Sequence, residues 1–261
     1  MVTQMVVRQL MPSSTPEICA AVESAMRSDI RVSALSAEDL LYGQIPADQR
    51  QLLTAGEATP VGSVEFLRSL MKRLGVAEPA PMDYPPELHD FLHREVRKKA
   101  AGLCGLEPEF IKPISTKTFT GFVFNVMDSE PTPGSPLQED YLAFMALPAE
   151  EKVWASEVVE WASEFRYYVL RDQIVGRARY DDGADSAPEP SEEVAMACID
   201  RLRPLGLAAY ALDLGTFPDG QTALIEVNDA WALGFYRGGI STNDYLSMLA
   251  ARWRQIASPS K

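Results

Sequence analysis

Two carboxylates and an asparagine stand in apolar runs late in the chain, and their residue types suit the binding of a hard cation. Residues 224–228 read Leu-Ile-Glu-Val-Asn, so in a strand Glu226 and Asn228 point to the same face. Asp213 lies in the similar run 210–214, and a hairpin pairing would bring the three side chains together. Three oxygen ligands of this kind suit Mg2+ bound to a polyphosphate. The alternative is that each carboxylate is buried against an arginine or backbone amides.

A second group of residues is cationic and suits the binding of phosphates. Lys112 follows Phe and Ile in a predicted strand, where an ammonium group is costly to bury unless it meets an anion. Lys117 lies in the next loop, whose serine, threonine and glycine backbone could present N–H groups to phosphates. Arg177 and Arg179 share one strand face, and a predicted hairpin partner contributes Arg166, so we expect a cluster of three arginines. Alternatively, these arginines are solvated and pair with surplus acids.

The composition limits the class of protein that carries these residues. The chain has 261 residues, 46% of them hydrophobic, and 24 Lys and Arg against 37 Asp and Glu give a net charge of −13. This acidic balance argues against a protein that neutralises a long nucleic acid or docks on an anionic membrane. No apolar run is long enough to span a bilayer and no secretory signal is visible. The three cysteines are far apart, so we predict a reducing cytoplasm and no disulfide framework.

The first hundred residues alternate between strand and helix signals. Thr15-Pro16-Glu17 combines a helix N-cap, a first-turn proline and a first-turn acid, and Ser36 begins a capping-box pattern. Gly75 ends a run of apolar residues at helical spacing. The sequence therefore predicts a strand at 5–10, helices at 15–26, from 36 and at 64–74, a proline-rich loop at 78–86 and a helix at 86–99.

From residue 110 onward the signals are mainly those of β-structure. We predict strands at 110–115, 121–126, 153–159, 165–171, 173–180, 208–217 and 222–227. The connection at residues 171–173 is short and polar, which predicts a hairpin. Helices are predicted at 191–205 and 243–256, and exposed loops rich in proline, glycine and acids at 128–140 and 181–193. The expected fold class is α/β, with α+β character in the C-terminal half.

The order of these motifs resembles the ATP-grasp superfamily. The series is Phe-Ile-Lys-Pro at 110–113, the Lys-Thr-Phe-Thr-Gly loop at 117–121, Ser-Glu-Val-Val at 156–159, Glu-Phe-Arg at 164–166, Arg177, Arg179, Asp213 and Glu-Val-Asn at 226–228. More narrowly, it is similar to the compact clade named for two arginines and a lysine. The resemblance implies an α/β pre-ATP-grasp domain at 1–100, a small central β-rich subdomain at 101–155 and a C-terminal antiparallel-sheet subdomain at 156–261.

The resemblance also implies a nucleotide site that binds ATP and Mg2+. On the phosphate side, Lys112 would contact the α- and β-phosphates, and Lys117 and its loop would close over the triphosphate. Adenine would meet backbone groups of Glu157 and Val159, and Glu164 would reach the ribose hydroxyls.

The remaining implied roles concern the metal and the reacting groups. Asp213, Glu226 and Asn228 would hold Mg2+, and Arg237 would face the acceptor substrate. The γ-phosphate or an acyl-phosphate would be gripped by three arginines, Arg166, Arg177 and Arg179. One departure from the family pattern lies at residues 229–231, where Asp-Ala-Trp follows the asparagine in place of the common proline or arginine.

The reaction implied is ligation of a carboxylate to an amine with release of ADP and phosphate, on an amino acid or peptide. It needs no protein nucleophile, and the two histidines form no Ser-His-Asp or Cys-His arrangement. His89 and His93 would lie one turn apart on the helix predicted over 86–99, a zinc-like spacing without further ligands, so a solvated helix face is the simpler interpretation. The alternative functions are a catalytically silent nucleotide-binding interaction protein and an RNA ligase or nucleotidyltransferase, whose Lys-x-Asp-Gly motif is absent.

Overall fold

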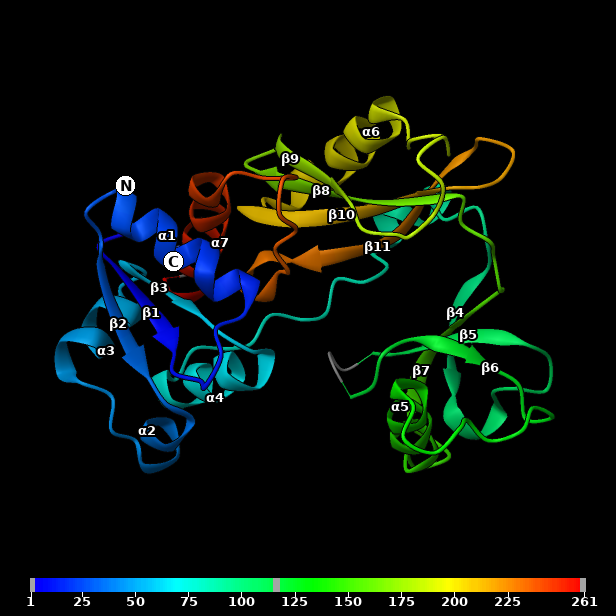
Figure 1. Ribbon diagram of the computed structural model, residues 1–261, viewed down its shortest axis with the longest axis horizontal. Coiled ribbons are helices and arrows are strands. Elements are labelled where there is room, and N and C mark those ends of the chain that lie inside the picture. Colours follow the sequence, from blue (N-terminus) through cyan, green and yellow to red (C-terminus); the bar gives the residue numbers. More distant parts are fainter. Residues whose placement is uncertain (1–2, 115–117, 259–261) are drawn as a thin grey trace. The chain divides into compact units, whose positions relative to one another are not determined.

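The computed structural model describes residues 3–114 and 118–258, which form two compact units (Figure 1). The large unit contains Met1–Leu88 and Ala162–Lys261, and the small unit contains His89–Trp161. The structure thus places the N-terminal α/β region and the C-terminal sheet in the same unit, with boundaries at 88 and 161. A shared core joins the two segments, because apolar side chains of the first and last helices pack together.

The N-terminal part of the large unit is a parallel three-stranded sheet with helices around it. Its elements are β1 (Met5–Gln9), α1 (Pro16–Arg27), β2 (Arg31–Leu35), α2 (Ala37–Tyr42), α3 (Ala47–Thr54), β3 (Ala58–Val61) and α4 (Val64–Leu74), and the strand order is β2-β1-β3. The predicted helix ends are confirmed: Thr15 accepts a hydrogen bond from Ile18 N, Ser36 forms a full capping box, and Gly75 has the left-handed conformation.

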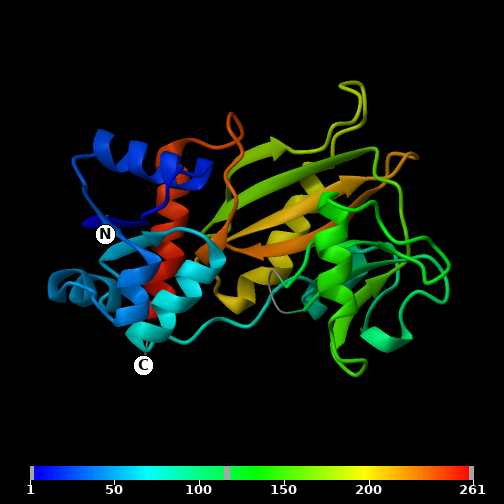
Figure 2. The same cartoon turned by 60° about the horizontal axis from the view of Figure 1, so that its bottom comes forward.

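The C-terminal part of the large unit is an antiparallel four-stranded sheet (Figure 2). Its elements are β8 (Ser163–Leu170), β9 (Gln173–Arg179), α6 (Glu192–Leu202), the 3-10 turn η3 (Arg203–Leu205), β10 (Ala209–Thr216), β11 (Thr222–Asp229), the 3-10 turn η4 (Ala230–Ala232) and α7 (Thr242–Ala257). The strand order is β11-β10-β8-β9. Arg171 and Asp172 both have positive φ, the conformation that suits a two-residue hairpin turn, so the predicted β8–β9 hairpin is confirmed.

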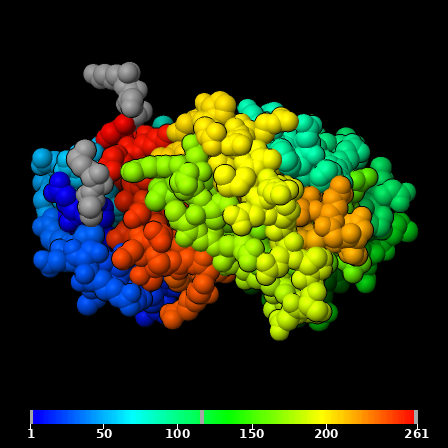
Figure 3. Space-filling model, turned by 90° about the horizontal axis from the view of Figure 1, so that it is seen from above, coloured from blue at the N-terminus to red at the C-terminus, as the bar shows by residue number. Residues whose placement is uncertain are grey.

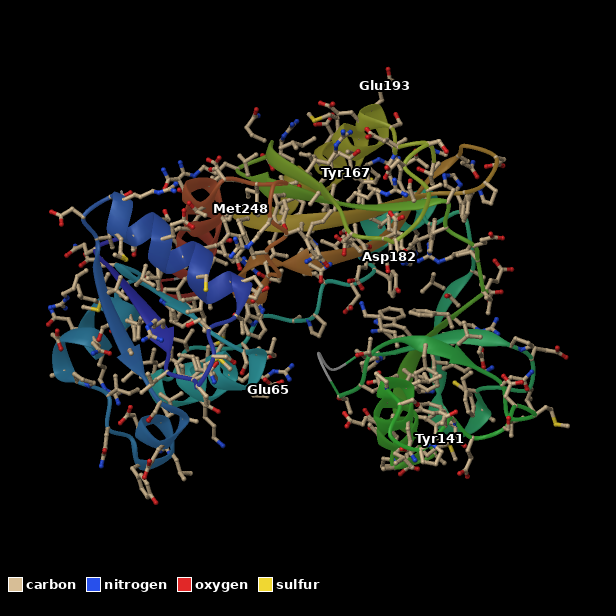
Figure 4. The ribbon with its side chains drawn as sticks, in the orientation of Figure 1. Glu65, Tyr141, Tyr167, Asp182, Glu193 and Met248 are labelled. Atoms are coloured by element: carbon tan, nitrogen blue, oxygen red, sulfur yellow. The ribbon has the colours of Figure 1, made fainter. Side chains whose placement is uncertain are left out.

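The two faces of this sheet are covered by different elements. Tyr167 points toward α6 and its hydroxyl donates to Pro190 O at 3.0 Å (Figure 4). The helix itself lies at the molecular surface (Figure 3). On the opposite face, Tyr168 and Ala211 join the core that contains α1 and α7, including Met248. Alternation along the strands therefore separates an α6 face from a face shared by α1, α7 and the candidate site.

The small unit is a second antiparallel sheet with its own core. Its elements are η1 (Pro86–Phe91), which crosses the boundary between the units, β4 (Val96–Ala100), η2 (Ala101–Leu103), β5 (Glu109–Pro113), β6 (Phe122–Phe124), α5 (Pro136–Met145) and β7 (Lys152–Ser156). The strand order is β4-β7-β5-β6. Phe119, Phe122, Phe124 and Phe144 meet mostly edge to face in its centre. These aromatic contacts attach α5 to one face of the sheet.

Several predicted elements differ from the structure. The helix predicted over 86–99 is wrong: a 3-10 turn ends at Phe91, His93 has a φ of 49°, and Val96–Ala100 is a strand paired with β7. The zinc-like spacing of His89 and His93 is therefore not presented by a helix. Further elements that the sequence did not predict are β2, α3, β3 and α5. In the described residues, no helix is long and apolar enough to cross a membrane.

Candidate functional site

The predicted pairing of two acidic strands is confirmed on the face of the large sheet that lies opposite α6. Asp213 on β10 is directly opposite Glu226 on β11 and Arg166 on β8. The amide nitrogen of Asn228 donates to Asp213 Oδ2 at 2.9 Å and to Glu226 Oε1 at 3.0 Å. Three residues predicted as metal ligands are therefore brought together, and they share their face with one of the predicted arginines.

Arg166 and Asp213 form a buried bidentate ion pair. The Nε of Arg166 donates to Asp213 Oδ1 at 2.8 Å, and its Nη2 donates to Oδ2 at 2.7 Å. The two side chains are only 10% and 3% exposed. Burial disfavours the charged guanidinium, but the carboxylate of Asp213 outweighs this effect, so the pKa of Arg166 is raised. Asp213 is therefore a buried carboxylate paired with an arginine, which is the arrangement that the sequence left open as an alternative to metal binding.

Aromatic rings cover the guanidinium group of Arg166. The rings of Tyr180 and Tyr236 stack at a centroid distance of 5.4 Å, and Arg166 Cζ lies 5.1 Å from the Tyr236 centroid and 5.9 Å from that of Tyr180. These contacts have cation–π geometry, which is stronger where water is excluded. Arg166 is therefore held by the carboxylate of Asp213 on the neighbouring strand and by the two tyrosine rings.

The loop that carries Tyr236 is fixed to the large unit by side chains from distant parts of the chain. The hydroxyl of Tyr168 donates to Gly234 O at 3.1 Å and accepts from Tyr236 N at 3.0 Å. Glu17 Oε1, at the start of α1, accepts from Phe235 N at 3.1 Å. These bonds position the residues that lead to Arg237, which is exposed beside Gly238.

Negative charge accumulates around this site. Burial raises the pKa of the Glu164 carboxyl, a hydrogen bond from Tyr180 opposes this, and Asp181, Asp213 and Glu226 raise the pKa further. Burial also raises the pKa of Tyr168 to about 12, so its hydroxyl stays protonated and able to donate. Among the described residues, Glu164, Asp213 and Glu226 contribute an excess of carboxylates over the guanidinium of Arg166. A divalent cation would neutralise this excess.

The donor set fits Mg2+ that is shared with a ligand. In the described part of the chain, no three His, Cys, Asp or Glu side chains are grouped closely enough to hold a metal alone. The candidate set instead has two carboxylates and an amide, with Asn228 holding the carboxylates of Asp213 and Glu226 close together. Mg2+ usually takes one or two carboxylates and completes its shell with water and phosphate oxygens. This chemistry matches the residues present.

The predicted cluster of three arginines does not form. Arg177 is directly opposite Tyr167, and Arg179 is directly opposite Phe165, so both arginines lie on the α6 face. Arg166 is opposite Ala178 and lies on the other face. Alternation along a strand therefore separates Arg166 from the other two.

Each of these two arginines has an acidic partner of its own. Arg177 pairs with Glu189 at 2.7 Å, and Arg179 makes two hydrogen bonds to Asp181 at 2.7 and 2.8 Å. These bonds to Arg179 lower the pKa of the Asp181 carboxyl far below its ordinary value. For Arg177 and Arg179 the structure thus shows the pairing with acids that was the alternative to a phosphate-binding role.

The other predicted nucleotide-binding residues belong to the small unit. Lys112 lies on β5 opposite Trp154 of β7, in a half-buried position. Glu157 follows the end of β7, and its carboxylate accepts from Glu95 N at 3.0 Å. Val159 is half-buried beyond the strand, which ends at Ser156 and not at 159 as predicted. Lys117 lies outside the described residues.

Comparison with known families identifies the fold. A sequence profile matches residues 91–248, more than half of the chain, and describes the ATP-grasp domain of family 2 in the clade named for two arginines and a lysine. The chain belongs to this clade of the ATP-grasp superfamily. The resemblance predicted from the motif order is therefore confirmed, and so is the ATP-grasp fold class. The cofactors of this ATP-grasp chain are ATP and Mg2+, and its activity in outline is ATP-dependent ligation.

Solved structures with the same fold are distant in sequence from this ATP-grasp chain. The D-cycloserine synthetase DcsG matches with a TM-score of 0.59 and 14% identity, covering 95% of this chain and 99% of that one. The ATP-grasp ligase PsnB, complexed with the precursor peptide PsnA2 and AMPPNP, matches with a TM-score of 0.56 and 14% identity, covering 96% and 97%. PsnB with a minimal precursor variant, Mg and ADP matches with a TM-score of 0.53 and 15% identity, covering 97% and 98%. A search of curated proteins finds no match.

Sequence reasoning missed several residues of the site in this ATP-grasp chain. Tyr168 could have been found, because it alternates with Arg166 on one strand and must share its face, as Glu164, predicted for the ribose, also does. Tyr180 directly follows β9, and its position over Arg166 depends on the hairpin register. The sequence marks Glu17 only as a first-turn acid of a helix, and nothing in it indicates the contact with Phe235, which is 218 positions away.

Proposed function

We propose that this chain is a carboxylate–amine ligase that forms ADP. A substrate carboxylate oxygen attacks the γ-phosphorus of ATP, the bond from that phosphorus to the β-phosphate oxygen breaks, and ADP leaves. The nitrogen of an amine then attacks the acyl carbon of the acyl-phosphate, phosphate leaves, and the amine loses a proton. The observation that carries the proposal is the joint placement of Arg166, Asp213, Glu226 and Asn228 on one sheet face.

We assign the metal to the acidic part of this face. Asp213, Glu226 and Asn228 would hold Mg2+, which when bound supplies positive charge to the phosphate oxygens. Arg166 holds Asp213 in a single orientation through its two hydrogen bonds. A fixed guanidinium and two preorganised carboxylates need little rearrangement during the reaction, which is the main source of electrostatic stabilisation.

The remaining assignments extend the proposal to the nucleotide and substrate. Lys112 and Lys117 would contact phosphates, and the backbone at Glu157 and Val159 would contact adenine. Glu164 would accept from the ribose hydroxyls. Arg237, on the loop anchored by hydrogen bonds of its neighbours, would face the acceptor substrate. These roles rest on the family pattern.

Arg177 and Arg179 need separate tests as phosphate ligands. Both lie on the α6 face and both have acidic partners. Arg166 is therefore the better candidate for a contact with the γ-phosphate or acyl-phosphate. Replacing Arg177 by Met should leave the KM for ATP unchanged, whereas a phosphate ligand would raise it.

The experiment that tests the proposal is thermal unfolding of wild type and Glu226→Gln, with and without Mg-ATP. A ligand present at about 100 times its Kd stabilises the folded state by roughly 2.7 kcal/mol, which is a Tm shift of several degrees at this chain length. We expect the shift in wild type and a smaller one in the variant. Glu189→Gln, on the opposite face, is the matched control and should behave as wild type.

Release of ADP then separates ligation from nucleotide binding alone. Wild type should release ADP when amino acids or peptides are supplied, and Glu226→Gln should not. Stabilisation by Mg-ATP without ADP release from any amine and carboxylate pair would identify a silent nucleotide-binding protein. Unchanged ADP release in Glu226→Gln would refute the metal assignment.

A further inference from the structure

A pocket of about 560 Å3 lies in the large unit, between α2 and α4. It borders Gln9 at the end of β1 and Ser63 at the N-cap of α4, just after β3. This is the carboxyl edge of the parallel sheet, where open α/β sheets bind their ligands. Glu65, labelled in Figure 4, lines the pocket from the first turn of α4. The volume is in the range of sites for small molecules and short peptides.

The floor of the pocket is apolar and is formed by buried side chains. Leu40 and Phe66 are each only 3% exposed and form the floor, while Leu41 is 66% exposed at the rim. A Cβ on Gly62 would lie 2.7 Å from the Phe66 ring and 2.8 Å from Gln9. The glycine thus lets these two lining side chains pack closely. An apolar side chain of a ligand would cover the exposed face of Leu41 and be removed from water.

The rim of the pocket is cationic at the C-terminal end of α4. Lys72 is exposed there, and its ammonium group makes no hydrogen bond or ion pair among the described residues. The guanidinium of Arg73 donates to Leu41 O, which ties α4 to the end of α2. Glu65 lies about two turns away on the same helix. In a chain with a net charge of −13, two neighbouring cations beside an apolar floor favour an anionic group next to an apolar one.

One stretch of chain connects the pocket wall to the candidate site. Gln9 Oε1 accepts from Ser63 N at 2.7 Å, which fixes the end of β1 against the start of α4. Residues 9–17 then lead to Glu17, which accepts from Phe235 N in the loop beside Arg166. The pocket and the site are thus at the two ends of a nine-residue segment that is bonded at both ends.

We propose that this pocket binds part of a peptide substrate, an apolar residue adjacent to a carboxylate. The apolar side chain fills the space over Leu41 and Phe66, and the carboxylate meets Lys72. The inference rests on the proposed function, because it names the class of substrate that the ligase would join. A free amino acid with a polar side chain would not fill the pocket.

The test measures peptide binding by calorimetry with the full chain. The probes are N-acetyl dipeptides that pair leucine or phenylalanine with aspartate or glutamate, and the control probes pair serine with glutamate and leucine with lysine amide. We expect the apolar–acidic peptides to bind wild type and the control peptides not to bind. Leu41→Ser should weaken binding about tenfold. Lys72→Glu should weaken it about fivefold, because an attractive surface pair becomes repulsive.

Two matched control variants separate the pocket from general surface effects. Leu205→Ser removes an exposed leucine outside the pocket, and Lys152→Glu reverses an exposed charge in the small unit. Both should bind the peptides as wild type does. No binding of any apolar–acidic peptide at millimolar concentration, or equal binding by Leu41→Ser and wild type, would overturn the inference. Either result leaves the Mg-ATP shift intact, whereas loss of that shift refutes the nucleotide site.

Discussion

Replacing Arg166 by Met should destabilise the chain strongly, and Mg2+ should restore part of the lost stability. The variant leaves the Asp213 carboxylate, only 3% exposed, without the guanidinium that makes two hydrogen bonds to it. Breaking a buried pair by removing one partner costs about 3–5 kcal/mol. At about 2–4 °C per kcal/mol for a chain of this size, the Tm should fall by roughly 6–20 °C.

Two further variants set the scale of this effect. Arg177→Met removes an ion pair whose side chains are 39% and 56% exposed, and should cost about 0–1 kcal/mol. Combining Arg166→Met with Asp213→Asn should recover much of the loss, because no buried charge is then left unpaired. The loss of unfolding free energy in the double variant should therefore be smaller than the sum of the losses in the two single variants, by about 0.5–3 kcal/mol.

The change in Tm on addition of Mg2+ is the decisive measurement. Removing the guanidinium takes one positive charge away from the neighbourhood of Asp213, Glu226 and Glu164, so Mg2+ should raise the Tm of Arg166→Met more than that of wild type. The double variant should lose this extra shift. The measurements are urea unfolding and thermal scans with Mg2+ or an equal ionic strength of NaCl. Equal Mg2+ shifts in all four proteins, or a loss in Arg166→Met no larger than in Arg177→Met, would refute this account of the site.

Three other predictions follow from burial and close packing. Glu164→Gln should raise the Tm at pH 8 but not at pH 4. Burial raises the pKa of the Glu164 carboxyl above 4.5, so ionisation of this group destabilises the folded state as the pH rises through the folded pKa. A lower Tm of the variant at pH 8 would contradict this. Gly239→Ala should destabilise by about 1–3 kcal/mol in urea, since its Cβ would lie 2.2 Å from a β9 side chain; an unchanged midpoint would argue against that packing. At pH 8 a thiol reagent should modify the exposed Cys19 quickly and the buried Cys104 and Cys198 slowly. Burial raises the pKa of Cys104 to about 11 and that of Cys198 to about 12. Equal modification rates at all three cysteines would show that the buried thiols are accessible.

Local signals account for the parts of the fold that the sequence predicted. Thr15 and Ser36 start helices because their side chains accept from free N–H groups of the first turn, and Gly75 ends one because it adopts positive φ without strain. The helix predicted over 86–99 is wrong because a contact between distant parts of the chain overrides the local signals. Val96–Ala100 becomes a strand because it pairs with β7, more than fifty positions later in the chain, and no local pattern expresses that pairing.

The same distinction runs through the candidate site. The sequence by itself determined that Glu226 and Asn228 share a face and that Asp213 could join them, because side chains alternate with a period of two along any strand. Only the tertiary structure decided which arginine faces them. The register of β8 against β9 puts Arg166 with Asp213 and sends Arg177 to the α6 face. A shift of one residue would reverse that choice, since register depends on packing between strands and not on either strand alone.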